Sequence, residues 1–351
     1  MNKYPTYSIG VMSGTSLDGV DLVCVAFNKK RSYSFDILYC ETIPYSKEWL
    51  HKLKKAFHYN KEQLKKLDID YGKYLADLIL NFIQKKQLKH IDFIASHGHT
   101  IHHKPDKGYT LQIGDGNTIA SKTKIKTICD FRSPDVALGG QGAPLVPIGD
   151  KYLFSEYFYC LNLGGFANIS FEKNNKRIAF DICAVNTVLN FYANKLGLDY
   201  DDRGEIAKNG KVNTNLLSEL NNLDFYKKNA PKSLGFEYVT SILLPLIDKF
   251  QLSEKDIMKT YVEHIAQQIA NKITKKENLF ITGGGVFNTF LMERITFFTN
   301  NEIIIPDKNT INFKEALIFA FLGLRKNENK INCLQSVTGA RKDHSSGVVY
   351  E

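Results

Sequence analysis

The stretch that decides the fold is residues 10–21, which read Gly10-Val11-Met12-Ser13-Gly14-Thr15-Ser16-Leu17-Asp18-Gly19-Val20-Asp21. It separates two apolar runs, residues 7–12 and 20–27, that are typical of two strands joined by a turn. Glycines let the backbone approach an anion closely and turn its N–H groups inward. The stretch therefore predicts a hairpin turn that clamps a phosphate, and an ordinary glycine-rich turn is the alternative.

Two carboxylates close this stretch, Asp18 and Asp21. Carboxylates beside a phosphate clamp could hold a hydrated cation. The spacing differs from a Walker motif, because no Gly-Lys-Thr or Gly-Lys-Ser follows and the next element is expected to be a strand. The stretch thus predicts phosphate binding by a hairpin and not by a P-loop.

Length and composition limit the possibilities. A chain of 351 residues exceeds the usual size of one core, so we expect two lobes, residues 1–150 and 151–351. No apolar run approaches the roughly 20 residues that span a bilayer, and no hydrophobic signal region opens the chain. The six cysteines are scattered without a Cys-x-x-Cys pair. We expect a cytoplasmic protein with buried free thiols and no membrane contact.

The formal net charge of +9 comes mostly from lysines in small separated clusters, such as residues 54–55 and 275–276. Most clusters fall in helix-like segments, where they are typical of solvated faces. We therefore expect no nucleic-acid partner, although a positive field would help to gather an anionic substrate.

The first half continues with a strand at residues 34–40, helices at 47–57 and 61–86, and a buried strand at 91–95. That strand is expected to end in Ser96-His97-Gly98-His99-Thr100. Its histidines could bind a metal, but no cysteine or His-x-x-x-His helix supports a zinc site. Substrate contact at the strand end is favoured.

Further buried strands are expected at residues 109–113 and 125–131, and the first ends in Gly114-Asp115-Gly116. Parallel-type strands with such ends place polar groups along one edge of a sheet. Residues 137–147 are dense in glycine and proline. They predict a loop that crosses between lobes, with a plain linker as the alternative.

The second half repeats the opening, with strands at residues 158–163, 168–171 and 177–180 before a helix at 186–196. Its first hairpin turn carries Gly164 and Gly165, so two lobes would offer two opposed phosphate clamps to a central cleft. A later buried strand, residues 279–282, ends in Gly283, Gly284 and Gly285. This cluster would let a flat ring pass close to the backbone at a helix N-terminus.

Taken together, the chain resembles the anhydro-N-acetylmuramic acid kinases of the actin, hexokinase and sugar-kinase superfamily. The resemblance runs nearly end to end and rests on long strings. These are residues 10–21, Ser96-His97-Gly98, Thr100, 110–115, Asp130-Phe131-Arg132, 139–147, 162–170, Ala230-Pro231-Lys232-Ser233, Gly283-Gly284-Gly285, Asn288, Glu315-Ala316 and Gln335-Ser336-Val337-Thr338-Gly339-Ala340.

The resemblance implies an α/β, two-lobed actin/hexokinase-like ATPase fold with duplicated three-stranded openings and an interlobe cleft. It implies that ATP, with Mg²⁺, phosphorylates the 6-oxygen of 1,6-anhydro-N-acetylmuramic acid while water opens the anhydro bridge. The product would be N-acetylmuramic acid 6-phosphate, formed in cell-wall recycling. The resemblance also suggests a homodimer.

The same resemblance implies the site residues. Asp181 would be the base that activates water, by general-base catalysis without a covalent intermediate. Asp18 would be the metal-side acid, and His97, Asp115 and Glu315 would contact the sugar. The residues expected to bind the nucleotide are Gly14, Thr15, Ser16, Leu17, Asp18, Gly19, Val20, Asp21, Gly164, Gly165, Gly283, Gly284 and Gly285.

Two departures from the family pattern bear on mechanism. The usual Asp-Thr-Gly-Pro-Gly-Asn is here Asp181-Ile182-Cys183-Ala184-Val185-Asn186, so the backbone is expected to follow a different path. His99 stands where glutamine is usual, and its charge would depend on pH. The alternatives are a non-catalytic nucleotide-binding relative, which the altered loop favours, and a kinase for another amino sugar. Retention of Asp181 and Glu315 favours the enzyme.

Overall fold

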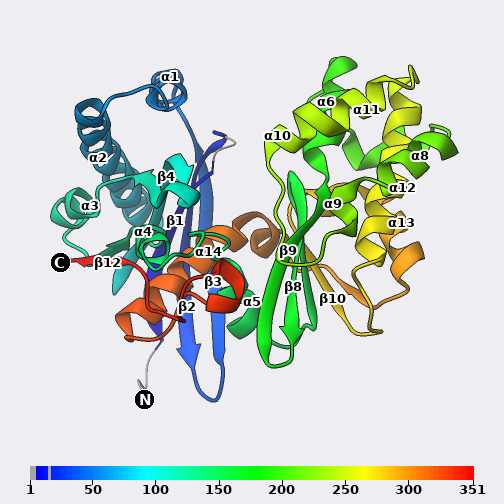
Figure 1. The fold of residues 1–351 in the computed structure, drawn as a ribbon. Helices are drawn as coiled ribbons and strands as arrows, with labels where there is room; N and C mark the ends of the chain where they lie inside the picture. The colour runs from blue at the N-terminus through cyan, green and yellow to red at the C-terminus, as the bar shows by residue number, and fades with distance from the viewer. Residues whose placement is uncertain (1–4, 15–16) are drawn as a thin grey trace. The chain divides into compact units, whose positions relative to one another are not determined.

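A computed structural model describes residues 5–14 and 17–351. The chain forms two compact α/β units (Figure 1). Unit 1 combines the described residues up to Phe154 with Phe313–Glu351, and unit 2 is Ser155–Asn312. The first expected boundary, at residue 150, lies close to the observed one. The expected second lobe, residues 151–351, differs, because residues 313–351 pack with the N-terminal segment.

Unit 1 is built on a seven-stranded sheet in the order β12-β6-β4-β1-β2-β3, with β5 paired to β4. The hairpin predicted from residues 10–21 is confirmed, since β1 and β2 are antiparallel with Gly10 opposite Val23. Strands β1, β4 and β6 are parallel to one another. The strands are β1 (Thr6–Ser13), β2 (Gly19–Lys29), β3 (Tyr33–Pro44), β4 (Phe93–Lys104), β5 (Tyr109–Ile113), β6 (Thr127–Cys129) and β12 (Val348–Tyr350).

Helix α2 shows why the sequence folds locally as it does. Asn60 and Gln63 form a reciprocal capping box at its start, and Leu64, Tyr71 and Leu75 bury one face against the sheet. The helices of unit 1 are α1 (Lys47–Ala56), α2 (Lys61–Lys85), α3 (Gly116–Thr123), α4 (Ser133–Ala137), α5 (Pro147–Tyr152) and α15 (Gln335–Thr338). Helix α14 (Lys308–Asn327) begins in unit 2 and continues into unit 1.

Helix α14 joins unit 1 because two glycines allow it to approach the sheet. A Cβ on Gly10 of β1 would collide with the carbonyl of Ala316, and a Cβ on Gly323 would lie 2.6 Å from the Cβ of Ala95 in β4. A buried ion pair of 2.8 Å between Lys314 and Asp150 adds a link to α5. The C-terminal segment therefore belongs to the first unit.

Three sequence expectations for unit 1 are corrected. Strand β4 does not end before the histidines but runs through them, with a register shift against β1 near the positive-φ Gly98. Strand β5 is antiparallel to β4, because the two form a hairpin across a short turn. Residues 137–147 do not cross between lobes, since α4, this loop and α5 all belong to unit 1.

Unit 2 contains a five-stranded sheet in the order β11-β10-β7-β8-β9. Its three-strand opening is confirmed, because β7, β8 and β9 form an antiparallel meander that leads into α6. The strands are β7 (Tyr159–Leu163), β8 (Phe166–Lys173), β9 (Lys176–Ala184), β10 (Leu279–Thr282) and β11 (Ile303–Ile304). The helices include α6 (Asn186–Lys195), α7 (Glu205–Lys208), α8 (Thr214–Asn221), α9 (Asp224–Lys227), α10 (Phe236–Tyr238), α11 (Leu244–Asp248), α12 (Glu254–Ala270) and α13 (Thr289–Thr299).

Five of the six cysteines are buried, as expected, and Cys40 is half-buried. Among the described residues, no helix combines the length and apolar character needed to cross a membrane.

The buried His264 of α12 makes the stability of unit 2 depend on pH. Its ring nitrogens lie 2.7 Å from the side-chain oxygen of Asn221 and 3.0 Å from the hydroxyl of Tyr226. Burial lowers the pKa of His264 to about 3. Between about pH 6.5 and 3, His264 is therefore protonated in the unfolded chain but neutral in the folded chain. The free energy of unfolding is thus highest above about pH 6.5 and falls as the pH drops toward 3.

We predict that the wild-type free energy of unfolding falls about 2 to 3 kcal/mol more between pH 6.5 and 4.5 than that of His264→Gln. Urea unfolding at the two pH values measures the difference. His58→Gln, a change at an exposed histidine, should follow the wild type. Equal losses in wild type and His264→Gln would contradict the assignment.

Candidate active site

The first glycine turn joins β1 to β2. Of its residues, Thr15 and Ser16 lie outside the described residues. Leu17 has a φ of 63°, which is uncommon for a leucine, and its N–H donates to the Gly14 carbonyl at 3.3 Å. A Cβ on Gly19 would collide with the carbonyl of Ile43, so this glycine is required by strand packing. The described part of the turn is a tight, strained loop after a parallel strand, where phosphate sites are commonly built.

Asp18 and Asp21 stand at the end of this turn, on β2 or next to it. Asp18 is exposed, and Asp21 accepts a hydrogen bond of 2.6 Å from the hydroxyl of Thr42. Burial raises the pKa of Asp21, and the charge of Asp18 raises it further. Two carboxylates that repel each other fit a divalent cation, because a shared positive charge removes the repulsion.

His97 and Arg132 form a linked pair at the same sheet. The Arg132 Nε–H donates to His97 Nε2 at 2.9 Å, and His97 Nδ1 lies 3.0 Å from the Gly98 carbonyl oxygen, which can only accept. Burial and the charge of Arg132 lower the pKa of His97. The neutral ring thus uses both nitrogens to hold Arg132, whose Nη1 donates to the Gly142 carbonyl at 2.7 Å. His97 has no ring nitrogen left for a ligand in this arrangement.

Glu315 of α14 lies in the field of Arg132 and Asp21. Part of its side chain is exposed to water, but partial desolvation by the surrounding protein raises the pKa of its carboxyl group. Arg132 opposes that rise, and Asp21 adds to it. Glu315, Arg132 and the acidic pair of the first turn therefore make one charged region on unit 1. Sequence reasoning did not single out Arg132, although the string Asp130-Phe131-Arg132 contains it.

His99 is part of a buried hydroxyl chain. Its Nδ1 lies 2.9 Å from the Ser13 hydroxyl, which also bonds to Tyr45, and Tyr45 contacts the hydroxyl of Tyr71 at 2.6 Å. Burial lowers the pKa of His99 to about 4. The ring is consequently neutral across the physiological range. The expectation that its charge depends on pH applies only to acidic solution.

Asp115 caps helix α3. Its Oδ1 accepts the N–H of Thr118 at 2.7 Å, and the Thr118 hydroxyl donates to the same oxygen. Asp68 of α2 lies nearby, accepts the N–H of Gly114 at 2.7 Å, and has a pKa that burial raises to about 6. Asp115 thus has a structural role that uses one oxygen, and its second oxygen has no hydrogen-bond donor among the described residues.

In unit 2 the two later glycine clusters lie at one edge of the sheet. Strands β7 and β10 are parallel, so Gly164 after β7 and Gly283 after β10 follow neighbouring strand ends. The Gly165 carbonyl accepts from the N–H groups of Val185 and Thr187 at 2.8 and 3.2 Å. The turn is therefore fixed to the start of α6, with Gly165 itself exposed.

The three glycines after β10 differ in the space around their Cα atoms. Gly283 has a φ of 87°, and a Cβ there would lie 2.7 Å from the Leu163 carbonyl. A Cβ on the buried Gly285 would lie 2.7 Å from the Leu163 Cβ. A Cβ on the exposed Gly284 would meet only the Asn186 side chain, at 3.9 Å. The fold requires Gly283 and Gly285, whereas Gly284 leaves open space beside the backbone, a cradle that a flat ring could fill.

Asp181 lies inside β9 and not at its end. Its Oδ2 accepts the N–H of Leu234 at 2.8 Å, and its own N–H donates to the Lys232 carbonyl at 3.1 Å. Oδ1 has no donor among the described residues. Burial raises the pKa of Asp181, while the Leu234 N–H and the charge of Lys232 oppose the rise. Burial in turn lowers the pKa of Lys232 to about 8.

The segment after Asp181 follows the different path that its sequence predicts. Residues 182–184 continue β9 past a register shift, and the chain turns into α6 only at Val185. Residues 182–185 are fully buried. The apolar side chains thus replace a flexible turn with a packed strand end, and this holds Asp181 on a rigid element.

Comparison with known proteins identifies relatives along the whole chain. Residues 6–351 match the profile of the family described as anhydro-N-acetylmuramic acid kinase. A protein of that name from Pasteurella multocida is 37% identical, covering 100% of this chain and 98% of its own. One from Mannheimia succiniciproducens is 36% identical, covering 98% of both chains. One from Sulfurimonas denitrificans is 34% identical, covering 98% of this chain and 99% of its own.

Similar solved structures are more distant. The activator of 2-hydroxyisocaproyl-CoA dehydratase from Clostridium difficile, with bound ADPNP, has a TM-score of 0.44 and 16% identity, covering 92% of this chain and 97% of its own. A ROK family glucokinase from Streptomyces griseus, in complex with glucose and AMPPNP, has a TM-score of 0.40 and 9% identity, covering 90% and 98%.

We predict that Gly284→Ala weakens ATP binding about tenfold, or ~1.4 kcal/mol, without unfolding the protein. The added methyl group fits the protein but occupies the space expected to receive a flat ring. Titration calorimetry with ATP measures the affinity. Gly197→Ala is the control for a loss of stability alone. Its φ of 78° disfavours alanine, but no atom lies within 4 Å of the new Cβ, so ATP affinity should not change. An unchanged affinity in Gly284→Ala would exclude Gly284 from the nucleotide site.

Proposed function

Because the chain belongs to the anhydro-N-acetylmuramic acid kinase family, we propose that it uses ATP to open and phosphorylate 1,6-anhydro-N-acetylmuramic acid. Water adds to the anomeric carbon, the bond from that carbon to the 6-oxygen breaks, and this oxygen takes the γ-phosphoryl group. The products are N-acetylmuramic acid 6-phosphate and ADP. The two-unit α/β architecture is the one that the resemblance to the actin and hexokinase ATPases implies.

The single observation that carries this proposal is the state of Asp181. It sits on a rigid strand with one oxygen held by the Leu234 N–H and the other free of donors among the described residues. Its raised pKa makes it a stronger base than an ordinary aspartate. We assign to Asp181 the removal of the proton from the attacking water. A purely nucleotide-binding relative would have no need for such a carboxylate.

We assign nucleotide binding to the glycine turns. The proposed phosphate contacts come from residues 14–21 in unit 1 and from Gly164 and Gly165 in unit 2, and Gly284 faces the adenosine. Asp18, with Asp21 beside it, would hold Mg²⁺, which neutralises triphosphate charge during phosphoryl transfer when bound.

We assign sugar binding to the charged region of unit 1. Glu315 and Arg132 supply a carboxylate and a guanidinium, and a guanidinium suits the carboxylate that a muramic acid carries. His97 is a positioning residue, since it holds Arg132 by its Nε2. Asp115 contributes through the oxygen that its helix cap leaves free.

Two further features are proposals of the same kind. A homodimer follows from the family resemblance, and light scattering of the purified protein tests it. A cytoplasmic location follows from the need for ATP, and fractionation of the source cells tests it.

The substrate assignment is tested by following ADP release with ATP and Mg²⁺ over a set of amino sugars. We expect turnover with 1,6-anhydro-N-acetylmuramic acid and at least tenfold less with 1,6-anhydro-N-acetylglucosamine, which lacks the lactyl carboxylate. Mass spectrometry of the product confirms the phosphate. Equal turnover with the sugar that lacks the carboxylate would favour a kinase for another amino sugar.

We predict that Asp181→Asn lowers kcat by about 10²- to 10⁴-fold with little change in the affinity for ATP or sugar. Asparagine fills the same space but cannot accept the proton. Steady-state kinetics give the rate, and calorimetry gives the affinities. Asp248→Asn, on the surface of unit 2, is the matched control and should keep normal kcat. Near-normal turnover in Asp181→Asn would move the role of base to another carboxylate.

A further inference from the structure

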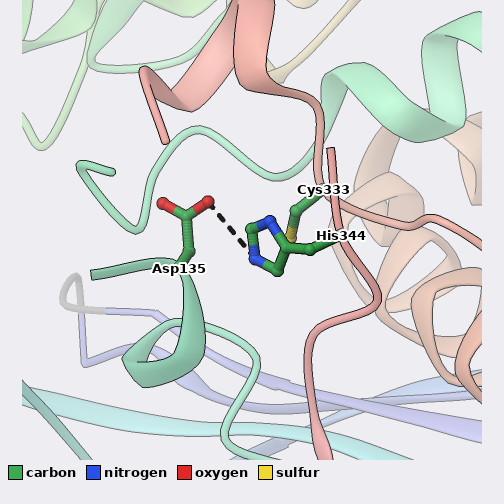
Figure 2. Close-up of side chains that lie close together, drawn as sticks. All are labelled: Asp135, Cys333 and His344. Atoms are coloured by element: carbon green, nitrogen blue, oxygen red, sulfur yellow. Dashed lines mark ion pairs between the residues drawn. The ribbon is translucent and has the colours of Figure 1, made fainter. Parts of the chain in front are cut away.

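Three side chains with metal-ligating atoms meet inside unit 1 (Figure 2), close to Arg132 but not among the residues assigned above to the reaction. They are Asp135 of α4 and Cys333 and His344 of the C-terminal segment. One ligand atom from each lies within 4.8 Å of the other two. Asp135 is 0% exposed and Cys333 is 1% exposed, and the His344 side chain is nearly buried. The kinase reaction proposed above assigns no role to these three residues.

The backbone fixes Cys333 and His344 as a pair. They form an isolated antiparallel bridge in which each N–H donates to the carbonyl of the other, at 3.0 and 3.1 Å. Side chains directly opposite each other in such a bridge project to the same face. The buried Asn332 holds the surrounding loop by accepting the Ser346 N–H at 2.6 Å. The thiol and the imidazole are thus held together before any ligand binds.

The imidazole of His344 presents a bare nitrogen to Asp135. Its Nδ1 lies 3.2 Å from the Lys342 carbonyl oxygen, which can only accept, so Nδ1 carries the hydrogen. In the neutral imidazole Nε2 is then the acceptor, and it is buried without a hydrogen-bond partner among the described residues. It faces Asp135 Oδ1 at 3.5 Å, as the dashed line in Figure 2 marks. That distance is too long for a hydrogen bond but close to the separation of two ligands on one zinc ion.

Two hydrogen bonds orient Asp135. Its Oδ2 accepts the Gly142 N–H at 2.7 Å, and its Oδ1 accepts the Thr338 hydroxyl at 2.7 Å. The charge of Asp135 also acts on Arg132, whose side chain donates its hydrogen bonds to His97 and to the Gly142 carbonyl. Hydrogen bonds of this kind, to the carboxylate and to the far nitrogen of a histidine, are typical of groups that orient metal ligands.

We propose that Asp135, Cys333 and His344 bind a zinc ion. A mixed set of carboxylate oxygen, thiolate sulfur and imidazole nitrogen suits zinc, whereas Mg²⁺ and Ca²⁺ prefer oxygen ligands alone. On binding, the Cys333 thiol loses its proton to solvent, and two anionic ligands balance the charge of the ion. The site ties the segment around residues 333–344 to α4, which directly follows Arg132. Its role is structural, because the site is buried.

Metal analysis of the intact protein tests the proposal. After growth with added zinc and extensive dialysis, we expect about one zinc per chain in the wild type and less than about a tenth of that in Cys333→Ser and His344→Gln. Cys24→Ser, at another buried thiol of unit 1, and His90→Gln, at an exposed histidine, should keep full zinc content. A wild type without zinc, or equal zinc in Cys333→Ser, would overturn the site.

A second measurement does not depend on whether the variants fold. Removal of zinc from the wild type by a chelator should lower Tm by several degrees, and Zn²⁺ but not Mg²⁺ should restore it, since metal binding contributes directly to folding. Replacement by Co²⁺ should produce thiolate-to-cobalt charge-transfer absorption. An unchanged Tm after chelation, or cobalt spectra without the thiolate band, would also overturn the proposal.

Discussion

Unit 1 depends on the close approach of α14 to β1 and β4. Gly10 and Gly323 permit it, because a side chain at either position would collide with the facing element. The approach brings Glu315, from the last fifth of the chain, beside β1 and β2, which come from the first fifth. It also returns the C-terminal segment to α4, where Cys333 and His344 meet Asp135. Both the charged region and the proposed zinc site therefore follow from one packing constraint.

Local patterns in the sequence were sufficient to predict most of the elements. The apolar runs on each side of residues 10–21 and of Gly164-Gly165 become hairpins, because glycine turns between strands carry a strong local signal. The lengths of strands were harder to predict. Strand β4 continues through His97 and His99 because it pairs with β1 and β5. The residues around the two histidines in the sequence give no sign of that pairing. Likewise, nothing near residue 313 indicates that the chain there rejoins its first unit.

The candidate site was predictable in its residue types but not in its contacts. His97 stands in a string that resembles a sugar-kinase motif, yet both of its ring nitrogens are used within the protein. Its partner Arg132 uses only Nε and Nη1 in hydrogen bonds within the described residues, and it is distant in sequence. The segment after Asp181 shows the opposite case. Its apolar residues predicted a path without a flexible turn, and the structure places them in a buried strand that keeps the carboxylate in a defined position.

The central claim is that Asp181 activates a water molecule whose oxygen ends in the sugar. Turnover of 1,6-anhydro-N-acetylmuramic acid in ¹⁸O-labelled water, followed by rapid quenching and mass spectrometry, tests it most directly. Unlabelled N-acetylmuramic acid 6-phosphate kept in the same water corrects for exchange at the anomeric carbon. The account predicts one solvent oxygen on the anomeric carbon of the phosphorylated product and none in its phosphate. A phosphorylated product without solvent oxygen, or with the label in the phosphate, would contradict it.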